Sequence, residues 1–94
     1  MKYIVYLDNG TEYGVMFPSG INHNHMADAI DVLRFGGDHN WHRRQGEVVA
    51  AGFIDRLGSC SGYSETLGIK SRGQIDTELF NQGGSRAVKM GEEK

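Results

Sequence analysis

The four histidines are the residues whose spacing most directly suggests chemistry, because all of them lie in one stretch, INHNHMADAIDVLRFGGDHNWHRR. Zinc takes three or four nitrogen, sulfur or carboxylate ligands in a tetrahedral array. His23 and His25 would place both rings on one side of an extended segment, and His39 and His42 would complete a site if the two ends of the stretch met. The same stretch also reads as polar flanks of a helix.

The helix expected between the two histidine pairs argues against a metal site. At 1.5 Å per residue it would hold the pairs on the order of 15 Å apart. The chain has one cysteine, and it contains neither a CxxC nor an HExxH motif. We therefore expect solvated histidines and no cofactor, and we keep as an alternative a metal site built from His23, His25, His39 and His42.

A second candidate surface follows that helix, where an aromatic ring stands beside local positive charge. Tryptophan and arginine are favoured in protein contacts, and an aromatic ring next to arginine also suits single-stranded nucleic acid. The net charge of −2 gives no broad basic stripe, which favours a protein partner. The predicted contact residues are Phe35, His39, Trp41, His42, Arg43 and Arg44. Two alternatives stay open: nucleic-acid binding through Trp41, Arg43 and Arg44, and burial of Trp41 beside the helix end.

Enzyme chemistry has weaker support. Cys60 lies in a GSCSG turn, an exposed setting in which a thiolate could react, but nothing in the sequence fixes a histidine beside it. The paired acids Asp28 and Asp31, and Asp76 and Glu78, are expected on exposed faces of helices, where solvation explains them. We therefore predict a protein that is not an enzyme.

Length and composition predict one small cytoplasmic domain. With 94 residues, 38% of them hydrophobic and 23% charged, the chain can build a single modest core. A lone cysteine forms no internal disulfide and fits a reducing compartment. No apolar run approaches the roughly 18 residues that a membrane-spanning helix needs.

The first half of the sequence predicts a β-hairpin and then a helix. KYIVYL and TEYGVMF are strand-like, and DNG between them can form a tight turn. A helix over 24–35 follows, with Asn22 or Asn24 as its cap. Its apolar stripe, expected to face the sheet, is Met26, Ala29, Ile30 and Leu33. Phe35 falls outside this stripe, either tucked under the next loop or open to a partner.

The second half predicts two strands and a second helix. EVVAAGFID, with small residues at its centre, suits a central and deeply buried strand, and YSETLGI suits another strand after the LGSCSG turn. Ser71 and Gln74 have capping-box spacing at the start of a helix, whose apolar face is Ile75, Leu79 and Phe80. Gly83-Gly84 ends this helix.

These elements predict an α+β fold of order ββαββα over residues 1–84, followed by a flexible polar tail over 85–94. The economical arrangement is a four-stranded, mainly antiparallel sheet with both helices packed on one face. The other face would then expose Tyr3, Val5 and Leu7. Loops and the tail could shield it, but we favour a contact surface for another protein or for a second copy of the chain, as in a homodimer.

The C-terminal third, GYSETLGIKSRGQIDTELF, together with the preceding VVAAGF strand, resembles small accessory proteins encoded by bacteriophages and prophages. The resemblance implies a compact cytoplasmic protein that binds a host or viral macromolecule. It carries over no catalytic or binding residue. Taken with the residues above, it predicts a non-enzymatic binding or regulatory protein that acts through protein–protein contact, such as a modulator of a host factor.

Overall fold

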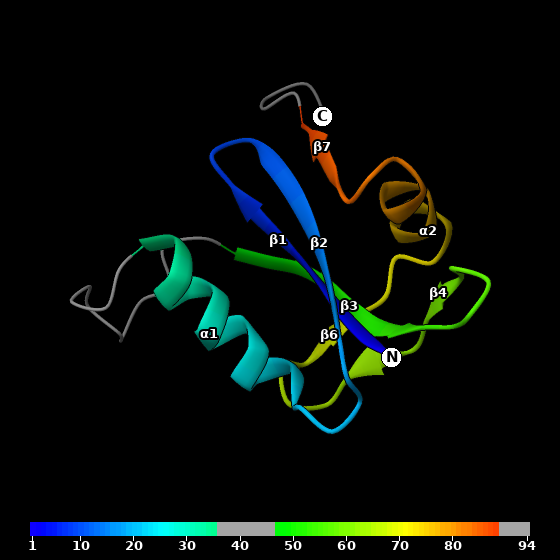
Figure 1. The fold of residues 1–94 in the computed structure, drawn as a ribbon, viewed down its shortest axis with the longest axis horizontal. Helices are drawn as coiled ribbons and strands as arrows, with labels where there is room; N and C mark the ends of the chain where they lie inside the picture. Colours follow the sequence, from blue (N-terminus) through cyan, green and yellow to red (C-terminus); the bar gives the residue numbers. More distant parts are fainter. Residues whose placement is uncertain (36–46, 89–94) are drawn as a thin grey trace.

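The structure is a computed structural model that describes residues 1–35 and 47–88, and it opens with the predicted β-hairpin (Figure 1). Strand β1 (Lys2–Asp8) pairs antiparallel with β2 (Thr11–Phe17). The Asn-Gly pair between them has φ of 52° and 82°. A two-residue turn with both φ positive matches the twist of the strands, and Asn-Gly adopts it readily. The hairpin prediction is confirmed.

The main sheet has five strands in the order β4-β3-β1-β2-β7, and all neighbours are antiparallel. The further strands are β3 (Glu47–Ile54), β4 (Cys60–Ser61) and β7 (Ser85–Ala87). The α+β class is confirmed, but the four-stranded sheet and the ββαββα order are not. Strand β1 lies in the middle of this order, and β3, predicted as a central strand, lies inside the sheet between β4 and β1.

Strand β7 lies in the segment predicted as a flexible tail. Its residues Ser85–Ala87 pair antiparallel with Thr11–Tyr13 of β2, so the tail prediction is corrected there. The Gly14 N–H also donates to the Gly84 carbonyl oxygen over 2.7 Å, just before β7 begins. Residues 89–94 of the predicted tail lie outside the described residues.

The single strand predicted over 63–69 is instead a short hairpin, β5 (Tyr63–Ser64) and β6 (Ile69–Lys70). Ser64 makes the turn that divides it: its Oγ accepts the Leu67 N–H over 3.1 Å, and its carbonyl accepts the Gly68 N–H over 2.8 Å. A serine side chain that bonds the nearby backbone offers the chain an alternative to a continuous ladder. Sequence alternation alone therefore overestimated the strand length.

Helix α1 (His23–Phe35) confirms the predicted helix, but only Met26 and Ile30 of its predicted apolar stripe pack in the core. Ile30 is buried as expected, together with Ala27, whereas Ala29 is exposed and Leu33 is 84% exposed. The face that meets the sheet is therefore rotated relative to the predicted stripe. A polar contact between Tyr6 of the sheet and Asp31 of α1 is the physical reason.

Asp31 lies on the buried face of α1, although the sequence placed it on the solvent side. The Tyr6 hydroxyl of β1 donates a hydrogen bond to Asp31 Oδ1 over 2.6 Å. Because a buried carboxylate needs hydrogen-bond donors, this contact fixes which side of the helix faces the sheet. A polar pair therefore overrides the apolar periodicity.

Helix α2 (Gln74–Asn81) confirms the second helix but not its capping box. Its N-cap is Gly73, with φ of 61° and no side-chain cap, and Ser71 lies before it. The Gln74 side chain donates to Glu78 Oε2 over 3.3 Å instead of reaching back. The Gly-Gly pair after the helix has positive φ and ends it as predicted.

In the described part of the chain, no helix is long and apolar enough to cross a membrane.

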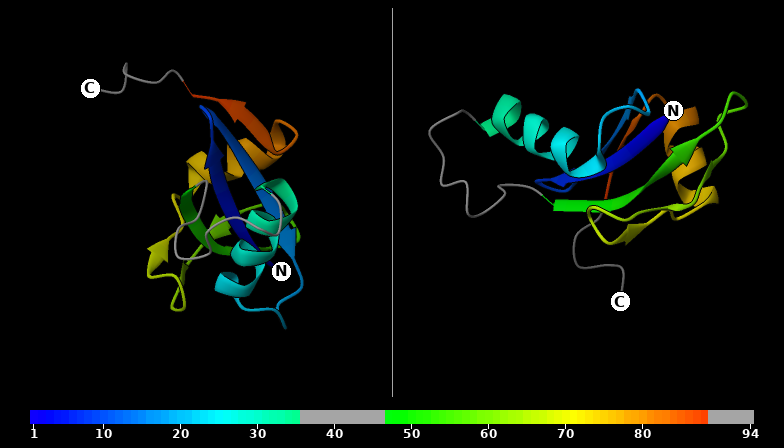
Figure 2. Two further views of the ribbon diagram at one scale, coloured as in Figure 1. Left: turned by 90° about the vertical axis from the view of Figure 1, so that its left-hand side faces the viewer. Right: turned by 90° about the horizontal axis from the view of Figure 1, so that it is seen from below.

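The two helices pack on opposite faces of the sheet, which corrects the prediction that both cover one face. Ile4 and Tyr6 of β1 pack with residues of α1, whereas Tyr3 and Val5 pack with Leu79 of α2. Successive residues of a strand point to opposite faces, so these two clusters lie on either side of the sheet. Figures 1 and 2 show α1 and α2 toward opposite ends of the twisted sheet. The apolar face expected to be free for a second copy is covered where α2 lies.

The close approach of β3 and β4 makes Gly52 a sensitive position. A methyl group on Gly52 would lie 2.4 Å from the Ser61 carbonyl oxygen, so the backbone has to shift. We expect Gly52→Ala to lower the free energy of unfolding by about 1–3 kcal/mol. Gly20→Ala, with no atom within 4 Å, is the control and should change it by less than about 0.5 kcal/mol. Urea unfolding followed by circular dichroism measures both, and equal midpoints would contradict this packing.

Candidate functional site

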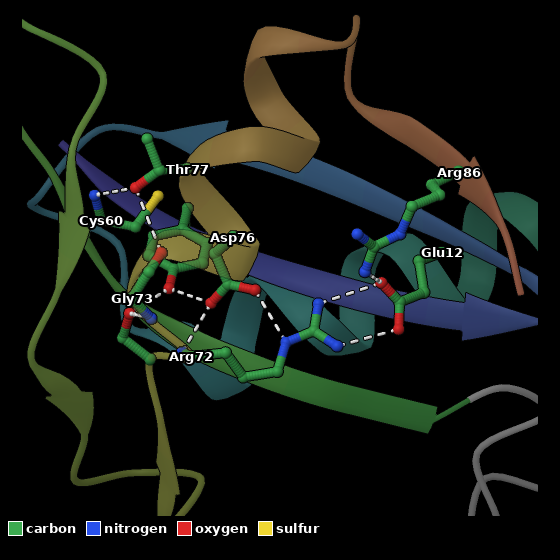
Figure 3. Close-up of polar contacts among 9 residues, drawn as sticks. Glu12, Cys60, Arg72, Gly73, Asp76, Thr77 and Arg86 are labelled. Carbon is green, nitrogen blue, oxygen red and sulfur yellow. Dashed lines mark hydrogen bonds and ion pairs between the residues drawn. The ribbon is translucent and has the colours of Figure 1, made fainter. Parts of the chain in front are cut away.

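A network of charged side chains, in which both carboxylates are buried, joins α2 to the sheet, and its centre is Arg72 (Figure 3). Arg72 Nε donates to Asp76 Oδ1 over 2.8 Å. Its Nη1 and Nη2 donate to the two carboxylate oxygens of Glu12, over 2.9 and 3.0 Å. Arg86 Nη2 of β7 also donates to Glu12, over 2.9 Å. One guanidinium thus links the first turn of α2 to β2 in a bidentate geometry that is strong and directional.

Tyr3 and Ser71 complete the network beneath α2. The Tyr3 hydroxyl donates to Asp76 Oδ2 and lies 2.7 Å from Ser71 Oγ. Asp76 Oδ2 also accepts the Arg72 backbone N–H over 2.8 Å. Asp76 is 0% exposed, so the prediction that it lies on a solvated helix face is wrong. Its partners compensate the cost of burying a carboxylate.

The surroundings shift the pKa values of the network in directions that favour the observed charges. Hydrogen bonds from Arg72 hold the pKa of Glu12 below its usual value. Burial, and then the hydrogen bond to Asp76, raise the pKa of the Tyr3 hydroxyl, which keeps its proton. These polar groups are paired with one another, so we interpret the network as a structural clamp.

Sequence reasoning missed this clamp, although part of its signal was present. Arg72 and Asp76 are four residues apart, a spacing that brings opposite charges together on a helix. Glu12, Arg86 and Tyr3 come from distant parts of the chain, and only the fold brings them to Arg72. The local half of the network was therefore predictable and the long-range half was not.

Cys60 is buried in β4, which corrects the expectation that it lies in an exposed turn. It is 6% exposed, and its backbone N–H donates to Thr77 Oγ1 of α2 over 3.0 Å. Burial raises the pKa of the Cys60 thiol, so the reactive thiolate is disfavoured. The small residue serves instead in the core beneath α2.

His23 and His25 belong to the first turn of α1, so the predicted pair on an extended segment is wrong. Residues two apart on a helix do not face each other. His23 is buried, and its Nε2 lies 2.9 Å from the Gly52 carbonyl oxygen, to which it donates. Its ring packs edge-to-face against Phe17 and Phe53, with centroids 5.6 and 5.7 Å away. Among the described residues, no three His, Cys, Asp or Glu side chains lie together in a group that could hold a metal ion.

The other predicted contact residues lie outside the described residues: His39, Trp41, His42, Arg43 and Arg44. Phe35 is the last residue of α1, and the structure describes its backbone only. The proposed roles of these residues in protein contact, nucleic-acid binding or metal binding therefore stay predictions.

A hollow of about 310 Å³ opens where the start of α1, β3 and the β5–β6 hairpin meet. Phe53 and Tyr63 are 44% and 53% exposed, and the Tyr63 hydroxyl donates to Glu65 Oε2 over 3.3 Å. The lining consists of His23, Phe53, Gly62, Tyr63, Glu65 and Thr66. We name it the aromatic hollow. Sequence analysis did not find it, because it is formed by three separate segments.

Comparison with protein-family models, with curated proteins and with solved structures gave no match. The function is therefore argued from the residues and their geometry.

The charge network predicts loss of stability at both ends of the pH range. The pKa of Glu12 is lowered in the folded state, so its contribution is complete above the ordinary value of 4.5 and is lost as the pH falls through the folded value. The pKa of Tyr3 is raised, so stability is lost as the pH rises past the ordinary value of 10.0. The buried Cys60 thiol acts in the same direction above its ordinary value of 9.0. Urea unfolding at fixed pH should show a plateau between about pH 5 and pH 8.5.

Glu12→Gln tests the acid side of this profile. At pH 7 we expect it to lower the free energy of unfolding by about 1–3 kcal/mol, because Arg72 loses a charged bidentate partner. It should also flatten the decline below pH 4.5. The exposed Glu78→Gln is the matched control and should change stability by less than about 0.5 kcal/mol. An unchanged acid profile in Glu12→Gln would show that Glu12 is not the group responsible.

The thiol of Cys60 should react with Ellman's reagent only when the protein opens. We expect the folded chain to react at least about 100-fold more slowly than the chain in denaturant, because both burial and the raised pKa suppress the thiolate. A matched control is Leu57→Cys in a Cys60→Ser background, because Leu57 is 90% exposed. Equal rates for the two thiols in the folded protein would refute the buried assignment.

Proposed function

We propose that this protein is a small non-enzymatic binding module that acts through protein–protein contact, with the aromatic hollow as a contact surface. The observation that carries the proposal is the pair of half-exposed rings, Phe53 and Tyr63, on the rim of a concave surface. Aromatic residues that line a depression are typical anchors of protein contacts. The resemblance to phage accessory proteins agrees with such a role and stays a prediction.

The Phe53 ring is held by the fold, which favours binding without rearrangement. A Cβ on Gly62 would lie 2.9 Å from the Phe53 ring, so the hairpin backbone lies directly against that ring. The Phe53 ring also packs edge-to-face with the buried ring of His23. Side chains that are ordered before binding lose less entropy when a partner docks.

The two alternatives from the sequence remain proposals of lower rank. Trp41, Arg43 and Arg44 are the residues on which single-strand binding depends, and they lie outside the described residues. The aromatic hollow carries the Glu65 carboxylate, whose charge opposes a nucleic-acid phosphate. A metal site formed by the histidines would have to do without the Nε2 of His23, which is engaged with the Gly52 carbonyl.

Affinity capture from the native cell or infected host tests the proposal. The double variant Phe53→Ala/Tyr63→Ala should recover a specific partner at least about tenfold less well than the unaltered chain, since anchor residues are worth about 2 kcal/mol or more. Leu57→Ala is the control, because this residue is apolar and 90% exposed but does not line the hollow. Circular dichroism confirms that the variants fold. A partner that binds the double variant equally well, or the lack of any reproducible partner, would count against the proposal.

A further inference from the structure

We infer that the aromatic hollow receives the side chain of an arginine from the partner protein. This inference rests on the proposed function and adds the chemistry of the contact. The rings, the charge and the size of the hollow support it.

The rings provide the first part of the recognition. Phe53 of β3 and Tyr63 of the β5–β6 hairpin border the hollow, and His23 of α1 completes the aromatic part of its lining. The faces of aromatic rings carry partial negative charge and attract a cation placed over them. A guanidinium is planar and weakly hydrated, so it stacks on such rings more readily than an ammonium group.

The charge of the lining selects a cation over an anion. Glu65 supplies a carboxylate, and the residues that line the hollow include no lysine or arginine. The Tyr63 hydroxyl donates to this carboxylate and helps to orient it. Lys70, opposite Tyr63 in the β5–β6 pair, is the basic residue on the same hairpin, but it is not part of the lining. A guanidinium can therefore stack on a ring and pair with Glu65 at the same time.

The size of the hollow suits a single side chain. Its volume of about 310 Å³ lies at the lower end of the range for ligand sites, roughly 300–1,000 Å³. Two of its lining residues are held by hydrogen bonds, from His23 Nε2 to the Gly52 carbonyl and from the Ser71 N–H to the Gly62 carbonyl over 2.9 Å. These contacts fix the walls before a ligand arrives.

A second hollow on the described surface provides a useful contrast. It measures about 330 Å³, and its lining is Met1, Met16, Ile54, Asp55 and Arg56. It contains both an acid and a base and no aromatic ring, so its charge does not select a cation. The aromatic hollow differs in having both features that a guanidinium requires.

Titration of the full-length, isotope-labelled protein with N-acetyl-arginine amide tests the inference by NMR. We expect saturable shifts of the amides of Gly62, Tyr63, Glu65 and Thr66, with millimolar affinity. The citrulline analogue, which has the same shape without the charge, should bind at least about fivefold more weakly. Shifts spread over the whole surface, or equal affinity for citrulline, would overturn the inference.

Three variants locate the binding in the hollow. Tyr63→Ala should abolish the shifts at the remaining reporter amides, and Glu65→Gln should weaken binding roughly three- to tenfold. Lys70→Gln, the matched control, should bind arginine as tightly as the unaltered chain or more tightly, because a nearby positive charge is removed. The amide spectra themselves show that each variant folds. Unchanged binding by both Tyr63→Ala and Glu65→Gln would place the arginine elsewhere and refute the inference.

A randomised peptide library, screened against the intact protein, separates this inference from the proposed function. Selection of arginine, lost in Tyr63→Ala, supports both. Selection of aliphatic or acidic residues at the hollow, or capture of a partner that depends on Phe53 and Tyr63 without any arginine preference, overturns the inference and leaves the proposed function standing. Partner capture that ignores both rings overturns the proposed function, and the inference falls with it.

Discussion

The contacts of Arg72 with Asp76 and Glu12 are the constraint on which the rest of the structure depends. Helix α2 has eight residues and a glycine N-cap without a side-chain cap, so it has little stability of its own. The negative charge of Asp76 in the first turn interacts favourably with the helix dipole. Hydrogen bonds from Arg72 and from the Tyr3 hydroxyl hold Asp76 in place. Burying the carboxylates costs desolvation free energy, and only a fully paired network compensates it, so we expect the network to form cooperatively. It joins α2, β1, β2 and β7 at one place and closes the second face of the sheet.

The same network supports the surface that we assign to binding. Ser71 lies beside the Tyr3 hydroxyl, and its N–H donates to the Gly62 carbonyl. Gly62 and Ser71 flank the two ends of the β5–β6 hairpin, so the buried clamp fixes the base of the hairpin that carries Tyr63. Packing of Gly62 against Phe53 then sets the distance between the two walls of the aromatic hollow. A core interaction is thus connected to the contact surface through one serine.

Local signals predicted much of the fold, and long-range contacts explain what they missed. The first hairpin, both helices and β3 follow from turn residues and apolar patterns within one segment. The face of α1 did not follow, because the Tyr6–Asp31 hydrogen bond joins residues far apart in the chain. The placement of the helices on opposite faces could not be predicted from β1, which is apolar on both sides. Such a pattern shows that a strand is buried on both faces, but not which element covers each face. The two-residue β5 and β6 and the three-residue β7 are too short to leave a periodic pattern. The aromatic hollow forms only where α1, β3 and the β5–β6 hairpin meet, so it could not be predicted from the sequence.

Native-state hydrogen exchange of the Ser71 and Arg72 amides tests most directly whether the clamp holds the hairpin and α2 as one unit. These hydrogens are donated to the Gly62 carbonyl and to Asp76 Oδ2. If the clamp is cooperative, both amides exchange only with global unfolding, and both lose protection together in Asp76→Asn. The account would be contradicted if the Ser71 amide exchanged through a local opening whose free energy is several kcal/mol below that of global unfolding, and if Asp76→Asn did not change this exchange. The buried clamp and the binding surface would then not be linked.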